Sequence, residues 1–162
     1  MAIEVTDILK GVGSAARAIS DGFKKNFIHI TPEDVISVLN EITIKKSQYT
    51  TESNVERLIS LRLNEEIGRV HRQYSIGGYI GLKVDVDLAD GKVGLEIKLA
   101  KQLNTACIER LFGQVLYYSR RTYKDNLIVV VVGQEKEYTQ ILREVETIIE
   151  EQGVRFHYLV VR

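Results

Sequence analysis

Hydrophobic and polar residues along the chain alternate with the periods of helices and strands. Apolar residues recur every three to four positions over residues 53–68, which predicts an amphipathic helix. Residues 127–133 are an unbroken apolar run ending in Gly133, typical of a strand buried on both faces. The other expected elements are, in chain order, a helix over 31–41, strands over 71–76, 80–89 and 92–100, a helix over 104–123, a helix over 135–152 and a strand over 154–161. Three consecutive strands followed by alternating helices and strands predict an α/β fold with a mixed sheet flanked by helices.

The first 30 residues differ in texture from the rest of the chain. Their apolar residues recur at helical spacing but are interrupted by glycines, so we expect one or two short amphipathic helices. Thr31 followed by Pro32 then marks a helix start, because Thr is a preferred N-cap and Pro suits the first helical position. We therefore expect an N-terminal helical region, 1–45, that packs on the core or on a second copy of the chain, and a core domain, 46–162.

A turn signal separates the second and third predicted strands. Asp90-Gly91 suits a two-residue type I′ hairpin, which would pair residues 89 with 92, 87 with 94, 85 with 96 and 83 with 98. Because side chains alternate faces along a strand, one face of this hairpin would carry Asp85, Asp87, Glu96 and Lys98. The opposite face would be apolar, with Val84, Val86, Leu88, Leu95, Ile97 and Leu99.

The polar face of the hairpin has the composition of a divalent-cation site. Asp85 and Glu96 would lie opposite each other, with their β-carbons about 5 Å apart. Mg²⁺ is usually held by one or two carboxylates together with waters and substrate phosphates. Lys98, on the same face as Glu96, would offset the repulsion between the carboxylates and would orient or deprotonate an attacking water.

A solvent-facing hairpin is the alternative interpretation, because Asp, Glu and Lys are common on exposed sheet faces. Two observations weigh against it: the flanking elements are expected to bury the sheet on both sides, and like charges directly opposite each other are unfavourable. Asp87 is an alternative to Asp85 as the ligand, since it lies on the same face. Pairing with Glu96 favours Asp85.

The order of elements and the spacing of these residues resemble the PD-(D/E)XK nuclease superfamily. Its core has a helix, a three-strand meander, a helix and a strand, usually followed by a further helix and strand. In that family an Asp on the second strand and a Glu-x-Lys on the third form the metal site; Asp85 matches the first and Glu96-Ile97-Lys98 the second. The resemblance covers roughly residues 50–162, and Val84 stands where the family has its name-giving Pro. It implies a restriction-endonuclease-like fold, α-β-β-β-α-β-α-β, with Mg²⁺ or Mn²⁺ as cofactor.

Two further matches lie on the predicted helices. Gln114 and Tyr118 resemble the Gln-x-x-x-Tyr motif of the RecB-like branch, and their i, i+4 spacing places both on one helix face. They would reach the site or the nucleic acid; a half-buried Tyr118 beside a surface Gln114 is the alternative. Many members also carry a Glu on the helix before the meander, and Glu56 is the candidate here. A capping box begun by Ser53 would instead occupy the Glu56 carboxylate at its own helix start. The other candidates are Glu52, Glu65 and Glu66.

A nuclease also needs contacts with phosphates. The candidates are Lys101, Tyr118, Arg120, Arg121 and Lys124, joined by Arg69 and Arg72 near the first strand. Each basic residue taken alone is more simply a solvated surface charge. The histidines show no ligand spacing, and we expect no catalytic role for His29, His71 and His157.

Composition narrows the partners and excludes other kinds of site. The 162 residues suit one domain, and 22 basic residues balance 22 acidic ones, so nucleic-acid binding would need a local basic patch. A single cysteine, Cys107, excludes a disulfide framework, a zinc ribbon and the four-cysteine iron–sulfur cluster of some RecB-like members. No stretch reaches the ~20 apolar residues of a membrane span, and the N-terminus lacks a signal-peptide pattern. We therefore expect a cytoplasmic protein.

The main functional hypothesis is a Mg²⁺-dependent nuclease, a hydrolase of phosphodiester bonds in nucleic acid, with DNA as the preferred substrate. Asp85, Glu96 and Glu56 would bind the ion, Lys98 would position the water, and Gln114 would have a secondary catalytic role. The alternative is a nuclease-fold module that no longer cleaves and binds nucleic acid or protein. A small interaction domain whose hairpin is only a polar surface is the third hypothesis.

Overall fold

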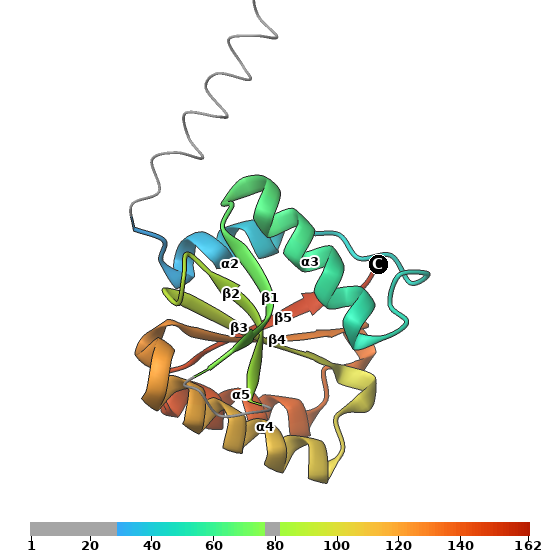
Figure 1. Cartoon of the computed structure of the whole chain (residues 1–162). Coiled ribbons are helices and arrows are strands. Elements are labelled where there is room, and N and C mark those ends of the chain that lie inside the picture. The colour runs from blue at the N-terminus through green and yellow to red at the C-terminus, as the bar shows by residue number, and fades with distance from the viewer. Residues whose placement is uncertain (1–28, 77–81) are drawn as a thin grey trace, which may run out of the picture.

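A five-stranded mixed sheet forms the centre of the protein (Figure 1). The computed structural model describes residues 29–76 and 82–162, so the helices predicted before residue 29 lie outside the described residues. The strands lie in the order β1-β2-β3-β4-β5. The pairs β1–β2 and β2–β3 are antiparallel, and the pairs β3–β4 and β4–β5 are parallel. Their bounds are β1 Val70–Ser75, β2 Lys83–Leu88, β3 Val93–Leu99, β4 Leu127–Gly133 and β5 Arg155–Val160.

Two helices cover each face of the sheet (Figure 1). Helices α2 (Pro32–Glu41) and α3 (Glu52–Glu66) lie on one face, and α4 (Thr105–Tyr118) and α5 (Gln140–Glu151) on the other. Short helical turns span Ala100–Gln102, Ser119–Tyr123, Lys124–Asn126 and Glu135–Glu137. The expected α/β class, a mixed sheet flanked by helices, is confirmed.

The strand β4 explains the unbroken apolar run in the sequence. Ile128, Val130 and Val132 pack under α2 and α3, whereas Leu127, Val129 and Val131 pack under α4 and α5. A strand that contributes alternate residues to two separate cores needs apolar side chains at every position. The sheet is therefore buried on both faces at its centre.

Capping residues set where the helices begin. Thr31 caps α2, with its side chain accepting a hydrogen bond from the Asp34 N–H while Asp34 closes a capping box, as the Thr-Pro signal predicts. Helix α3 begins at Glu52 because Thr51 is its cap, accepting from the Asn54 N–H. The predicted start at residue 53 and the capping box from Ser53 to Glu56 are wrong. The cap lies two residues earlier, which frees the Glu56 carboxylate from the helix end.

The segment before α3 packs on the same core as the rest of the chain. Val35 and Leu39 of α2 are fully buried in the cluster under α3, and Ile44 forms a parallel β-bridge with Val161. Ile30, Val35, Leu39 and Ile44 thus belong to the same core as the sheet.

The hairpin register agrees with the sequence near the turn and departs from it further away. Asp87 pairs with Gly94 as predicted, flanked by Val86 with Leu95 and Leu88 with Val93. The predicted two-residue turn is wrong, because Ala89, Asp90 and Gly91 all have positive φ and the Lys92 N–H bonds the Leu88 carbonyl at 3.1 Å. The expected ladder pairs of 85 with 96 and 83 with 98 do not form.

The two strands separate at Asp85, and this changes which face the neighbouring side chain covers. The Asp85 carboxylate accepts the Ile97 backbone N–H at 2.7 Å, so a side chain takes the place of a ladder partner. Val84, predicted to share a face with Val86 and Leu88, instead packs in the core under α4 and α5. The hairpin is therefore flat near its turn and opened beyond Val86, where the polar residues lie.

No helix among residues 29–76 and 82–162 is long and apolar enough to cross a bilayer.

Candidate functional site

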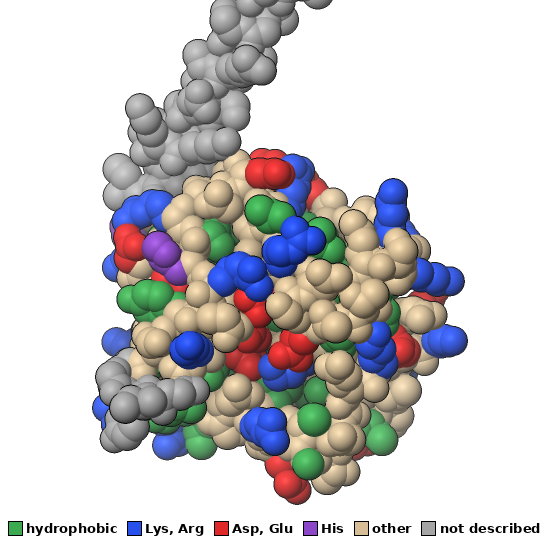
Figure 2. Space-filling view, turned by 45° about the vertical axis from the view of Figure 1, so that its right-hand side comes forward, with side chains coloured by type: hydrophobic (Ala, Val, Ile, Leu, Met, Phe, Trp, Pro, Cys, Tyr) green, Lys and Arg blue, Asp and Glu red, His purple; other side chains and the backbone are tan. Residues whose placement is uncertain are grey.

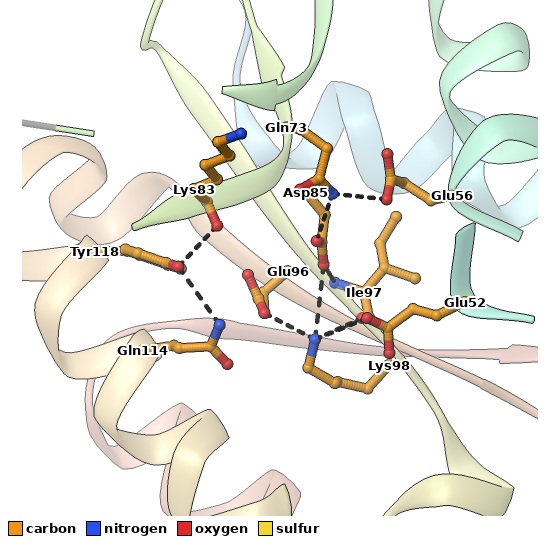
Figure 3. Close-up of polar contacts among 10 residues, drawn as sticks. All are labelled: Glu52, Glu56, Gln73, Lys83, Asp85, Glu96, Ile97, Lys98, Gln114 and Tyr118. Atoms are coloured by element: carbon orange, nitrogen blue, oxygen red, sulfur yellow. Dashed lines mark hydrogen bonds and ion pairs between the residues drawn. The ribbon is translucent and has the colours of Figure 1, made fainter. Parts of the chain in front are cut away.

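A cleft of about 430 Å³ opens where β2 and β3 separate, between the start of α3 and one side of α4. The polar face of the hairpin contributes Asp85, Glu96 and Lys98 to its walls. Figure 3 shows these side chains pointing toward one another, with Glu52 entering from α3 and Gln114 and Tyr118 from α4. The cleft thus gathers residues that lie up to 66 positions apart, from Glu52 to Tyr118.

Asp85 is held by a hydrogen bond to each of its carboxylate oxygens. Oδ2 accepts the Ile97 N–H at 2.7 Å, and Oδ1 accepts the side-chain amide of Gln73 at 3.1 Å. The residue is 7% exposed. Two donors on opposite oxygens fix the plane of this carboxylate at the edge of the cleft.

Glu96 is almost completely buried, at 1% exposure. Burial raises the pKa of its carboxyl to about 8, the Asp85 carboxylate raises it too, and the Lys98 ammonium opposes both. Its Oε2 atom is buried without a hydrogen-bond partner among the described residues. A buried acidic oxygen that lacks a donor is costly unless a ligand or cation completes it. The interpretation of this hairpin as a solvated polar surface is therefore wrong.

Lys98 provides the positive charge at the centre of the cleft. Its Nζ lies 2.8 Å from Glu96 Oε1, 3.3 Å from Glu52 Oε1 and 3.8 Å from Asp85 Oδ2, and donates to the Ile97 carbonyl at 3.0 Å. Burial alone would lower the pKa of Lys98, but Glu96, Asp85 and Glu52 together raise it above its usual value. The side chain stays an ammonium surrounded by oxygens (Figure 3).

Glu52, and not Glu56, is the helix carboxylate that reaches the cleft. Glu52 contacts Lys98, and burial raises its pKa. Glu56 is 3% exposed and accepts from Arg72 Nε at 2.8 Å and from Gln73 Nε2 at 2.8 Å. It therefore lies behind Asp85, one helical turn further along α3, rather than beside Lys98.

Gln114 and Tyr118 both line the cleft from one face of α4. The Tyr118 hydroxyl donates to the Lys83 carbonyl at 2.8 Å, and Gln114 Nε2 lies 3.5 Å from that hydroxyl. Burial and the nearby Glu96 raise the pKa of Tyr118 to about 12. Gln114 Oε1 is buried without a partner in the described structure. The alternative of a surface Gln114 is thus wrong, and its free amide oxygen adds a second unpaired acceptor to the cleft.

Asp87 is bound to a different part of the molecule. It is fully buried, accepts the Tyr123 hydroxyl at 2.7 Å and the Gly91 N–H at 3.1 Å, and does not line the cleft. Gly94 has no side chain to block this contact, since a β-carbon there would lie 2.6 Å from the Tyr123 ring. Between the two aspartates, only Asp85 is placed at the cleft.

Of the predicted phosphate-binding residues, Tyr118 lines the cleft, whereas the basic residues are not gathered there. Lys101 donates to the Tyr49 and Thr50 carbonyls just before α3, at 2.9 and 3.1 Å. Arg120, Arg121 and Lys124 are exposed beyond the end of α4 and do not line the cleft. Arg69 bonds Asp90, and Arg72 bonds Glu56. Each of these side chains has a position that the sequence alone could not give.

Two exposed residues that sequence reasoning missed line the cleft, Arg110 on α4 and Lys83 on β2, whose carbonyl faces Tyr118 while its ammonium points away (Figure 3). Figure 2 shows acidic side chains in a hollow of this face with Lys and Arg side chains around them. The amide of Gln73 was also missed, because nothing in β1 marks it. Arg110 could have been found from the sequence, because it precedes Gln114 by one helical turn on the same face of the predicted helix.

Comparisons of the chain with protein-family models, curated proteins and solved structures gave no match. The site therefore has to be interpreted from its own geometry. Within the described residues, no group of three or more His, Cys, Asp or Glu side chains converges to hold a metal ion. The predicted three-ligand set of Asp85, Glu96 and Glu56 is not brought together, and what the cleft offers is Asp85 and Glu96 with Glu52 beside them.

Proposed function

We propose that the protein is a Mg²⁺-dependent nuclease of the PD-(D/E)XK type, with a restriction-endonuclease-like fold and DNA as its substrate. The observation that carries the proposal is the convergence of Asp85, Glu96 and Lys98 in one cleft, with Lys98 Nζ 2.8 Å from Glu96 and 3.8 Å from Asp85. The chain order from α3 to β5 also agrees with the resemblance described above.

The charge balance of the cleft supports the binding of a divalent cation. Three carboxylates, Asp85, Glu96 and Glu52, surround one ammonium, and the Glu96 Oε2 atom has no partner in the part of the chain that the structure describes. Hard oxygen ligands and a surplus of negative charge suit Mg²⁺, which is commonly held by only one or two protein carboxylates, with waters and substrate completing its shell. Asp85 and Glu96 would hold the ion, and Glu52 would contribute charge.

The metal, when bound, supplies the positive charge that stabilises a phosphodiester transition state. The Lys98 ammonium, which now bonds the carboxylates, would orient the attacking water by donating a hydrogen bond to its oxygen. The Ile97 N–H and the Gln73 amide would keep Asp85 facing the ion. Gln114 would bind substrate or water through its amide oxygen, which has no partner among residues 29–76 and 82–162.

An exposed cation on the cleft wall supports a polyanionic substrate. Arg110 lines the cleft and is exposed, whereas Lys98 is engaged with carboxylates. Phosphate groups of a nucleic-acid strand are attracted to such side chains irrespective of sequence. We propose that the backbone of the strand crosses the cleft between β2 and α4.

Replacement of Lys98 tests the proposal. Lys98→Ala should abolish cleavage of labelled DNA in Mn²⁺ or Mg²⁺ while circular dichroism shows an intact fold, and Lys98→Met repeats the test with the length of the side chain retained. Lys92→Ala, the same substitution at an exposed turn residue of the same hairpin, should cleave as the wild type does. Full activity in both Lys98 variants would refute the assignment.

A second candidate function is a nuclease-fold module that binds nucleic acid without cleaving it. It is favoured by the absence of a convergent three-ligand group in the described residues. It is also favoured by the Lys98 ammonium, which neutralises part of the negative charge of the carboxylates. Thermal stabilisation by Mn²⁺ separates the two functions, because a module without a metal site should show none.

A further inference from the structure

Gln73 adopts a backbone conformation that its residue type disfavours. Its φ is +51°, in the left-handed region that favours glycine. The strand around it is regular, with Arg72 paired to Val86 and Tyr74 paired to Val84, and only the position opposite Asp85 leaves the ladder. Because Gln73 is the strained residue beside the candidate site, its backbone conformation suggests a functional role for its side chain there.

The side-chain amide of Gln73 joins two carboxylates. Its Nε2 donates to Glu56 Oε2 at 2.8 Å and to Asp85 Oδ1 at 3.1 Å (Figure 3). One amide nitrogen has two N–H groups, so both contacts can be made at once. On a regular strand backbone the Gln73 side chain would stand perpendicular to the sheet. The left-handed backbone of Gln73 instead directs its amide between Glu56 and Asp85.

The outer end of this connection is anchored. Glu56 Oε1 accepts from Arg72 Nε at 2.8 Å, and the Glu56 side chain is 4% exposed. Arg72, Glu56, Gln73 and Asp85 therefore form a continuous chain of charge-assisted hydrogen bonds that runs from β1 through α3 to the cleft. The far oxygen of Asp85 is fixed by the Ile97 N–H at 2.7 Å.

We propose that Gln73 is a positioning residue for the metal ligand Asp85, with Glu56 as its support rather than as a ligand. The inference rests on the proposed function, because it assigns Asp85 the role of a ligand. Partners that orient a metal ligand through hydrogen bonds typically change metal affinity by 10–100-fold when they are removed. The strained backbone of Gln73 is retained because a relaxed residue would not place the amide between the two carboxylates.

Two substitutions separate the amide from the backbone strain. Gln73→Gly removes both, while Gln73→Met removes the amide and keeps the strain and most of the volume. Both should weaken Mn²⁺ binding, measured by titration calorimetry on the full chain, by 10–100-fold. The melting temperature should fall less in the Gly variant than in the Met variant, because both lose the hydrogen bonds to Glu56 and Asp85 and only the Gly variant relieves the strain. Ala89→Gly, which relaxes another left-handed residue in the neighbouring hairpin turn, should keep wild-type affinity.

The outcomes distinguish this inference from the function on which it rests. Wild-type Mn²⁺ affinity in both Gln73 variants would overturn the positioning role and leave the nuclease proposal standing. Weakened binding in the Met variant alone, following its loss of stability, would also overturn it. A wild-type protein that binds no Mn²⁺ would overturn both proposals together.

Discussion

At the residue scale, Asp85 and Asp87 show how two identical side chains on one strand acquire different roles. The sequence places both on the same face, and only their partners separate them. Tyr123, 36 positions away in sequence, takes Asp87 into a buried hydrogen bond of 2.7 Å. The Ile97 N–H and Gln73 leave Asp85 at the cleft. Alternation along a strand predicted the pair, whereas contacts distant in sequence decided between its members.

Removal of the Tyr123 hydroxyl tests this division of roles. Tyr123→Phe leaves the buried Asp87 with the Gly91 N–H as its remaining donor among the described residues, so we expect a loss of about 1–3 kcal/mol in the free energy of unfolding at pH 7, measured by urea denaturation. Mn²⁺ affinity should not change, because Asp87 does not line the cleft. A variant with wild-type stability but impaired Mn²⁺ binding would contradict the assignment.

The same variant should show a pH dependence of defined sign. Burial raises the pKa of Asp87, and the hydrogen bonds from Tyr123 and Gly91 oppose the rise. Without the Tyr123 bond the pKa of Asp87 rises further above the unfolded value of about 3.9. Such a carboxyl lowers the free energy of unfolding as the pH rises from its unfolded pKa to its folded pKa. The difference between variant and wild type should therefore shrink as the pH is lowered from 7 to 4.

At the element scale, local signals predicted most of the architecture. The apolar run of β4 and the Thr31-Pro32 cap gave elements whose limits agree with the structure. The errors came where a tertiary contact competes with local preference. Thr51 rather than Ser53 caps α3, and Lys101 holds the Tyr49 and Thr50 carbonyls just ahead of it. That contact joins residues about 50 positions apart, which no local pattern reveals.

A matched pair of cap substitutions follows from this arrangement. Thr31→Ala and Thr51→Ala each remove one N-cap hydrogen bond, and each should cost about 1 kcal/mol in the free energy of unfolding. Only Thr51→Ala should weaken Mn²⁺ binding, because the first turn of α3 carries Glu52, whose carboxylate contacts Lys98. Equal Mn²⁺ affinities in the two variants would show that the start of α3 has no part in the site.

At the scale of the whole molecule, the sequence predicted the centre of the site better than its surroundings. Asp85, Glu96 and Lys98 could be found because they lie on two adjacent strands joined by one turn and share one motif, although the predicted pairing of residue 85 with residue 96 does not form. Glu52, Gln73 and Arg110 come from three other elements, and their convergence depends on how α3, β1 and α4 pack around the opened hairpin. The prediction that Glu56 is a metal ligand failed for the same reason. Glu52 contacts Lys98 in the cleft, whereas Glu56, one helical turn further along α3, lies behind Asp85.

Metal binding should be visible as a change in global stability. A ligand at 100 times its dissociation constant stabilises the folded state by about 2.7 kcal/mol, and in a chain of this size each kcal/mol raises the melting temperature by roughly 2–4 °C. We expect such a rise with Mn²⁺ in the wild type and none in Glu96→Ala, measured by scanning calorimetry with EDTA-treated protein as the reference. A rise of equal size in both proteins would place Mn²⁺ outside the cleft.

The position of the Lys98 ammonium among four oxygens has a consequence for folding in the absence of a divalent ion. Buried carboxylates left without a counterion lower the stability of the folded state. An internal cation that contacts Glu96, Asp85 and Glu52 provides that counterion from within the chain. We therefore expect the polypeptide to reach its native state without a divalent ion, so that, if the proposed metal site exists, folding and metal binding are separate events in time.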